Sequence, residues 1–188
     1  MIDLTKGQEL ALATEDGQPL TRLQMGVGWD KEPTAGFIGT GAPDIDLDAS
    51  AVQFAGDQLF DLAFYNNLQT RDGSVVHQGD NLTGRGEGDD ERLTVDLSRV
   101  YGKVDTIAFL VSSYQGHSLE WINRAYCRLV VDDDVELARF TLTAGVTETG
   151  LAMATLFRDG EQWKLRAIGE GIAVKVPTES VEALRRFL

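Results

Sequence analysis

Short runs of alternating apolar and polar residues, broken by Gly, Asp and Asn, constrain the fold of this chain more than any other feature. Apolar residues occupy alternate positions in segments 23–29, 93–97 and 107–111. A period of two places those side chains on one face of a half-buried β-strand. The pattern therefore predicts strands separated by tight turns.

Two hairpins extend this prediction. Segments 125–131 and 135–142 read as strands joined by a turn of three aspartates at 132–134. Segments 151–158 and 161–168 flank the dipeptide Asp159-Gly160, which is a strong hairpin signal. Many short strands with turn signals between them indicate an all-β fold, a two-sheet β-sandwich in a single domain spanning residues 1–188.

Two helical stretches are also expected, a short one around 119–123 and a C-terminal one over 178–188. In the second, Thr178 would cap the helix, acidic residues would lie in the first turn and basic residues near the end. Its residues in these roles are Glu179, Glu182, Arg185 and Arg186, and Val181, Leu184 and Leu188 would share its buried face.

Composition narrows the class of partner. The net charge is −13 over 188 residues, which disfavours binding to nucleic acid or anionic membranes and favours divalent cations. Cys127 is the one cysteine, which favours a reducing compartment. The amino-terminal residues lack the pattern of a signal peptide, and no apolar run is long enough for a membrane span. We therefore expect a cytoplasmic protein.

A first acidic motif lies at 44–50. In an extended segment, Asp44, Asp46 and Asp48 would share one face. Close carboxylates repel by about 1 kcal/mol per pair even in water, and a divalent cation relieves that repulsion. A solvated strand face is the alternative interpretation. An EF-hand loop is excluded, because its sixth and twelfth positions would be Ala49 and Ala55.

A second motif, at 77–91, is rich in glycine and in side-chain oxygens. Its glycines allow tight turns that aim backbone carbonyls inward, and the surrounding acids disfavour a phosphate ligand. Such a loop suits calcium, which prefers six to eight oxygen ligands. Two other segments could add oxygens, 28–30 and 65–67, although Asp30, Asn66 and Asn67 could equally serve in turns.

At these motifs the sequence resembles the TerD family of bacterial tellurium-resistance and stress proteins. The matching segments are 4–8, 26–30, 46–50, 64–67, 79–91, 123–126 and 163–171. The resemblance covers about residues 4–171, and 79–91 is its most specific part. Residues 115–118 and the tail from 177 to 188 depart from the family pattern.

The resemblance implies a β-sandwich that binds calcium, commonly as two ions. It implies side-chain oxygen ligands from several segments and backbone carbonyls from two glycines. The implied ligands are Asp30, Asp44, Asp46, Asp48, Asn66, Asn67, Asp80, Asn81, Gly84, Gly86, Asp89, Asp90 and Glu91.

Three functions remain to be weighed. The first is a non-enzymatic calcium-binding module that assembles with other proteins of the tellurium-resistance system. The second is a calcium-dependent hydrolase acting on a phosphoester or a similar small substrate, for which His77, His117 and Ser50 are the available groups. The third is a metal-free scaffold. Direct tellurite reduction is disfavoured because Cys127 has no partner thiol and reads as a core residue.

Overall fold

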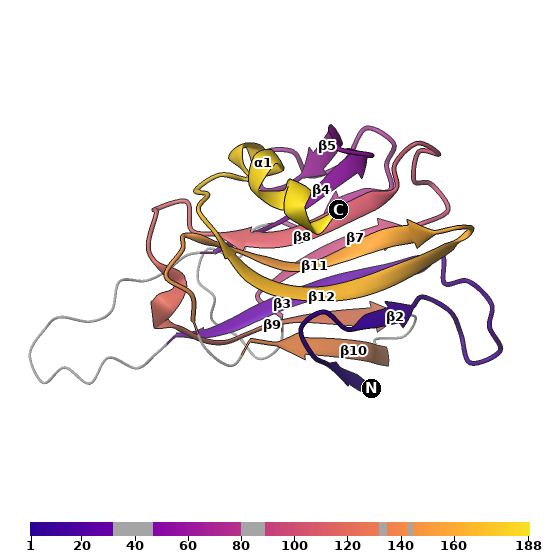
Figure 1. Ribbon diagram of the computed structural model, residues 1–188, viewed down its shortest axis with the longest axis horizontal. Coiled ribbons are helices and arrows are strands. Elements are labelled where there is room, and N and C mark those ends of the chain that lie inside the picture. The colour runs from indigo at the N-terminus through magenta and orange to yellow at the C-terminus, as the bar shows by residue number, and fades with distance from the viewer. Residues whose placement is uncertain (32–46, 80–88, 132–134, 143–144) are drawn as a thin grey trace, which may run out of the picture.

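The structure, a computed structural model, describes residues 1–31, 47–79, 89–131, 135–142 and 145–188. Within these ranges, two six-stranded sheets pack face to face, so the predicted β-sandwich is confirmed (Figure 1). Sheet A has the strand order β1 (Ile2–Leu4), β10 (Val135–Thr141), β9 (Ile122–Val131), β3 (Arg22–Lys31), β7 (Glu91–Asp96) and β6 (Val75–His77). Sheet B has the order β2 (Glu9–Ala11), β12 (Gln162–Ile172), β11 (Gly150–Asp159), β8 (Thr106–Ser112), β4 (Asp48–Ala55) and β5 (Gln58–Ala63).

The alternation read from the sequence produces the main core between the sheets. On β3, Met25 and Val27 are each 1% exposed and belong to this core. Met25 pairs with Leu93 on the antiparallel neighbour β7, so the apolar faces of both strands coincide. The intervening positions of β3, among them Gly26 and Gly28, therefore face away from sheet B.

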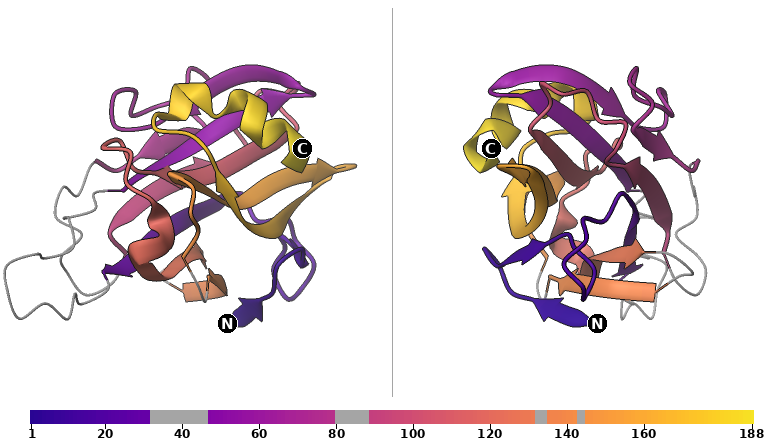
Figure 2. Two further views of the ribbon diagram at one scale, coloured as in Figure 1. Left: turned by 60° about the vertical axis from the view of Figure 1, so that its left-hand side comes forward. Right: turned by 90° about the vertical axis from the view of Figure 1, so that its right-hand side faces the viewer.

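Strand β8 is buried on both faces, because sheet B is covered on its outer side as well. Phe109 and Val111 pack into the main core, whereas Ala108 and Leu110 belong to a second apolar cluster. Leu184 of the C-terminal segment completes that second cluster and is fully buried, a burial that stabilises by roughly 1.5–3 kcal/mol for a leucine. Figure 2 shows this helical segment lying across sheet B.

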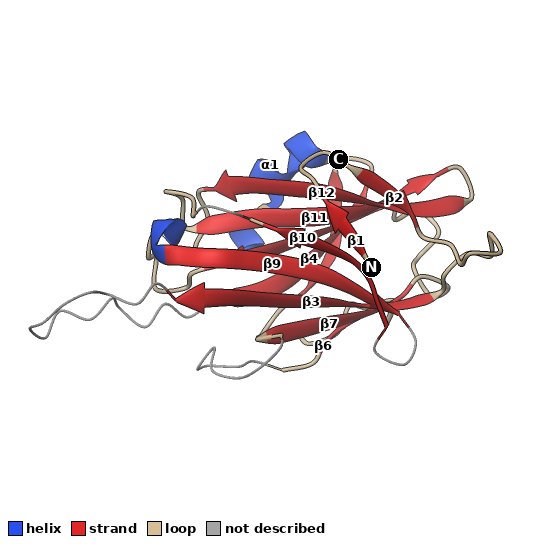
Figure 3. Cartoon of the chain, turned by 90° about the horizontal axis from the view of Figure 1, so that it is seen from below, coloured by secondary structure: helices blue, strands red, loops and turns tan. Residues whose placement is uncertain are grey.

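The helical predictions hold in outline and need correction in detail. The stretch near 119–123 is a 3-10 turn, Leu119–Trp121, and the tail contains 3-10 turns Pro177–Glu179 and Arg185–Phe187 around the four-residue helix α1 (Val181–Leu184) (Figure 3). Thr178 does not cap a helix, because it lies inside the first 3-10 turn and Ser180 precedes α1. Leu188 is 38% exposed, because the last turn tightens to 3-10 pitch and rotates it off the buried face.

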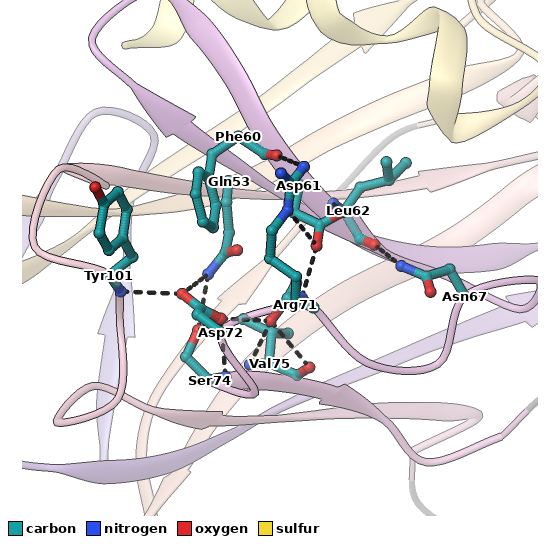
Figure 4. Close-up of polar contacts among 11 residues, drawn as sticks. Gln53, Phe60, Asp61, Leu62, Asn67, Arg71, Asp72, Ser74, Val75 and Tyr101 are labelled. Atoms are coloured by element: carbon teal, nitrogen blue, oxygen red, sulfur yellow. Dashed lines mark hydrogen bonds and ion pairs between the residues drawn. The ribbon is translucent and has the colours of Figure 1, made fainter.

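Asp72 fixes the connection between β5 and β6 (Figure 4). Its carboxylate accepts hydrogen bonds from Thr70 Oγ1 at 2.8 Å and from Ser74 N and Oγ at 3.0 and 2.8 Å. It also accepts from Tyr101 N at 3.0 Å and Gln53 Nε2 at 3.3 Å. Burial alone would raise the pKa of Asp72, but these hydrogen bonds outweigh it and lower the pKa below its usual value. One carboxylate thus ties this connection to β4 and to the 97–105 loop.

We therefore expect Asp72→Asn to destabilise the protein by about 2–3 kcal/mol at pH 7, since the amide cannot accept all of these hydrogen bonds. The folded-state pKa is depressed, so the carboxylate contributes stability above its unfolded pKa of about 3.9 and loses it as the pH falls. Urea unfolding at pH 7 and pH 2.5 should show the gap between wild type and variant shrinking in acid. Asp16→Asn, in an exposed turn, is the control, and an equal gap at both pH values would contradict the assignment.

Candidate metal centre

The ends of several strands from both sheets meet at one end of the sandwich. On β3 and β7, Val27 pairs with Glu91, and on β4 and β8, Asp48 pairs with Ser112. The two sheets are linked there, because Ala49 N on β4 donates to Glu91 Oε2 on β7. Strand β5 runs antiparallel to β4, so the residues that follow it, including Asn66 and Asn67, lie toward the same end. The described segments that carry Asp48, Asn67 and Glu91 therefore lie toward the same end of the sandwich.

The three consecutive acids 89–91 point in three directions. Asp89 lies on the outer face of sheet A, where it bonds to Arg128. Asp90 Oδ2 accepts a hydrogen bond from Trp29 N at 2.9 Å, which fixes it to the end of β3. Glu91 faces the interior and is 2% exposed. Regular alternation would put Asp89 and Glu91 on the same face. Asp89 and Asp90 precede β7, however, and Asp90 N bonds to the carbonyl of Val27, the residue that pairs with Glu91, so the backbone there departs from regular alternation and the carboxylates separate.

Asp89 is held by a network of charges across sheet A. Arg128 Nε and Nη2 bond its two oxygens at 2.6 and 2.9 Å, and Arg92 Nε lies 3.2 Å from Oδ2. Tyr126 Oη donates to Oδ1 at 3.2 Å. Burial and the neighbouring Asp89 charge raise the pKa of Tyr126 to about 12, so its hydroxyl stays protonated. Glu136 extends the network by pairing with Arg128 at 3.2 Å.

Two glycines of β3 make room for this network. Gly26 pairs with Arg92 on one side and Arg128 on the other. A Cβ built on Gly26 would lie 2.2 Å from Asp89 Oδ2, and one on Gly28 would lie 2.4 Å from Tyr126 Oη. The missing side chains leave a trough in which the carboxylate bridges the two arginines. The two glycines of the 26–30 motif are thus explained by packing, because a side chain at either position would overlap Asp89 or Tyr126.

His77 lies inside the sandwich beside Glu91 and is 2% exposed. Its Nδ1 accepts a hydrogen bond from Gly79 N at 3.2 Å, so the proton of a neutral ring lies on Nε2. Nε2 lies 3.1 Å from Ala49 O and 3.4 Å from Glu91 Oε2. Both ring nitrogens therefore have protein partners, as expected of a structural histidine.

Asp48 and Asn67 occupy different settings. Asp48 is 6% exposed, and by strand alternation it shares the face of β4 that carries Val52 and Phe54, the face turned away from sheet A. Asn67 Nδ2 donates to Leu62 O at 2.6 Å and its backbone pairs with Phe64, a turn role that leaves the side-chain oxygen available.

The remaining predicted ligands are not described in full. The backbone of Asp30 pairs with Asn123 at the end of β3. The others lie outside the described residues: Asp44, Asp46, Asp80, Asn81, Gly84 and Gly86. Among the residues that are described, no three His, Cys, Asp or Glu side chains gather closely enough to hold a metal ion.

Cys127 is a core residue, as predicted. It belongs to the main apolar cluster, and burial raises the pKa of its thiol to about 12. A protonated, inaccessible thiol is a poor nucleophile. No helix in the described part of the chain is long and apolar enough to cross a membrane.

Comparison with known proteins gives consistent results. The TerD domain family matches residues 1–178. The tellurium resistance protein TerD of Serratia marcescens is 40% identical over 184 residues, which cover 92% of this chain and 91% of the relative. TerZ of the same organism is 38% identical over 173 residues, covering 90% and 89%. Stress response protein SCP2 of Bacillus subtilis is 36% identical over 184 residues, covering 90% and 92%.

A solved structure shares the fold. It is described as a homologue of telluride resistance protein TerD from Streptomyces coelicolor, and it superposes with a TM-score of 0.66 at 20% identity. The match covers 86% of this chain and 95% of that one.

The glycine trough yields a double-mutant test. Gly26→Ala should destabilise the protein by about 2–3 kcal/mol, because its Cβ would overlap the Asp89 carboxylate. In an Asp89→Ala background the same substitution should cost less than about 1 kcal/mol, since the overlap is gone. Gly102→Ala is the control, because a Cβ there meets nothing within 4 Å. Equal Gly26→Ala penalties in both backgrounds, measured by urea unfolding, would contradict the packing described.

Proposed function

The chain belongs to the TerD family of tellurium-resistance and stress-response proteins, and from this premise we propose that it is a calcium-binding module of such a system. The observation that carries the proposal is the meeting of carboxylate-bearing strand ends from both sheets. Asp48 begins β4 and Glu91 begins β7, and the Ala49–Glu91 hydrogen bond joins the two strands.

The chemistry of the donors fits a hard cation. The described donors are carboxylates, with an amide oxygen at Asn67, and calcium selects oxygen ligands of these kinds. Asp48 and Glu91 are almost fully buried, and Glu91 already accepts a hydrogen bond from Ala49 N, so a bound cation would add to protein contacts that hold these carboxylates in place. A bound cation would supply positive charge at this end of a chain whose net charge is −13.

Within this proposal the residues divide into ligands and supports. Glu91 faces the interior and Asp48 the outer side of sheet B, so these carboxylates and Asp90 would be divided between two ions, with Asp30, Asn66 and Asn67 as neighbours along the same end. The full set of oxygens would also draw on the sequence-predicted donors Asp44, Asp46, Asp80, Asn81, Gly84 and Gly86, and two ions would share them. Asp89 would contribute indirectly. Its ion pair with Arg128 holds the backbone just before Asp90 and Glu91 against sheet A.

The ion would act on the structure rather than on a substrate. It would hold the first residues of β4 and β7 together, and so fix the end of the sandwich as one surface. A surface that forms on metal binding suits a module that docks onto other proteins of the tellurium-resistance system.

We expect calorimetry on chelator-stripped protein to show calcium binding with a Kd below about 1 mM. Calcium should also raise the melting temperature, because it binds only the folded state. Glu91→Gln and Asp48→Asn should each weaken binding about tenfold, whereas Asp16→Asn should not. Absence of both heat and thermal shift, in protein shown to be folded, would refute the calcium proposal.

The alternative of a calcium-dependent hydrolase finds less support. The Nδ1 lone pair of His77 already accepts from Gly79 N, which leaves the ring no free lone pair to act as a base. Ser50 is fully buried on β4, out of reach of a substrate.

We therefore expect a screen of phosphoester and carboxyl-ester substrates, with calcium present, to show no turnover above the buffer. Turnover that His77→Gln abolishes, in a variant that still binds calcium, would support the hydrolase instead.

A further inference from the structure

A pocket on the outer face of sheet A is independent of the proposed calcium centre. It has a volume of about 380 Å³, and we define it, as the arginine pocket, by Arg22, Gln24, Val76, Thr94, Arg99 and Val130. Its strands β3, β7 and β6 lie side by side in Figure 3. Arg22 begins β3 and Asp30 lies near its other end, so the pocket is about 26 Å from the candidate metal centre, at about 3.3 Å per residue.

The guanidinium of Arg99 is the distinctive group in this pocket. Among the described residues it has no hydrogen bond or ion pair with the protein. Other arginines on the sheets, such as Arg128 and Arg166, pair with carboxylates. An unpaired guanidinium beside a hollow is unexpected in a chain with a net charge of −13, because carboxylates outnumber basic groups.

The nearby carboxylate of Asp96 does not form an ion pair with Arg99. Asp96 pairs with Arg22 at 3.3 Å and also accepts hydrogen bonds from Ser98. The Ser98 hydroxyl, followed by Arg22, lowers the pKa of Asp96, so it remains a carboxylate already supplied with donors. The charge of Arg99 therefore remains available to a ligand.

The Arg99 guanidinium packs against Gly73, where no side chain blocks it. A Cβ on Gly73 would lie 2.5 Å from Arg99 Nη2, so the guanidinium lies directly on the glycine backbone. Gly73 has φ of +69°, and the neighbouring Asp72 and Ser74 hold its turn through hydrogen bonds (Figure 4). The guanidinium thus lies in the pocket lining, and no hydrogen bond between it and the described residues has to break when a ligand binds.

The rest of the pocket lining indicates which groups a ligand needs besides its anionic group. Val130 is 2% exposed, although it faces outward from sheet A, and Val76 lies beside it in the lining. The Thr94 hydroxyl is occupied, since it bonds to Val76 O and accepts from Gln78 Nε2. The Gln24 amide has no side-chain partner among the described residues, so it can bond to a ligand.

From this geometry we propose that the arginine pocket binds a small organic anion, a molecule that carries a phosphate or carboxylate group on an apolar body. The anion bonds to the fork of Arg99, which suits the oxygens of either group. The apolar body covers the valine floor, and Gln24 bonds to a polar edge. The volume lies within the range of small-molecule sites and exceeds what an inorganic oxyanion fills.

The test is an amide-resolved NMR titration of the full chain in chelator, so that calcium plays no part in the result. The probes are phenyl phosphate, benzoate, inorganic phosphate and benzyl alcohol. Phenyl phosphate or benzoate should shift the amides of Gln24, Gly73 and Val95 saturably, with a Kd of about 1 mM or tighter. Inorganic phosphate should bind at least about fivefold more weakly, and benzyl alcohol should not bind. The tighter of the first two probes identifies the anionic group.

Arg99→Gln should weaken binding about tenfold and Gln24→Ala about threefold, both with an unchanged spectrum elsewhere. Lys103→Gln removes the same charge from an exposed residue outside the pocket lining and should have no effect. The proposal is overturned if neither anion saturates, if Arg99→Gln binds as well as wild type, or if the shifts fall outside the pocket. Equal binding by inorganic phosphate would refute the role of the valine floor.

Discussion

At the end of the sandwich that holds the candidate metal centre, the arrangement of the strand ends depends on the buried carboxylate of Glu91. It belongs to β7 of sheet A and accepts a hydrogen bond from Ala49 N on β4 of sheet B. Apolar packing between sheets is non-directional and does not by itself fix how two strand ends meet. A buried carboxylate does, because leaving it without partners costs several kcal/mol. The bond also fixes the backbone beside Asp48, since Ala49 is the next residue on β4.

Much of the fold could be predicted from the sequence. Successive side chains of a strand point to opposite faces, so an alternating apolar pattern indicates both the strand and the face that is buried. The segments 23–29, 93–97 and 107–111 became β3, β7 and β8. The hairpin predicted at Asp159-Gly160 joins β11 to β12, but its turn lies one residue later, at 160–161, because Asp159 still pairs with Gln162. The tail was harder to predict. A helical period was expected through Leu188, but α1 ends at Leu184 and the chain tightens into a 3-10 turn. Local pattern indicates the buried Leu184 and cannot fix the pitch of the turn that follows it.

The candidate site was predicted as a set of segments and not as a geometry. The sequence treats 77–91 as one oxygen-rich loop, whereas β7 begins at Glu91 and sends Asp89 to the outer face of sheet A. Which face a residue takes depends on strand register, and register is set by partners distant in sequence, here Val27 and Arg128. The glycines at 26 and 28 carried the missing signal, because they fall on outward positions of a strand where a side chain is normally present.

The two outer faces of the sandwich differ in a way that determines where binding chemistry can occur. On sheet B the outward positions Ala108 and Leu110 are apolar, and the C-terminal segment with Leu184 covers them. On sheet A the outward positions include Gln24, Gly26 and Gly28, which cannot form an apolar layer. The outer face of sheet A instead holds the Asp89 network in its middle and the arginine pocket toward the start of β3. Apolar packing thus covers the outer face of sheet B, whereas the outer face of sheet A keeps polar and charged groups.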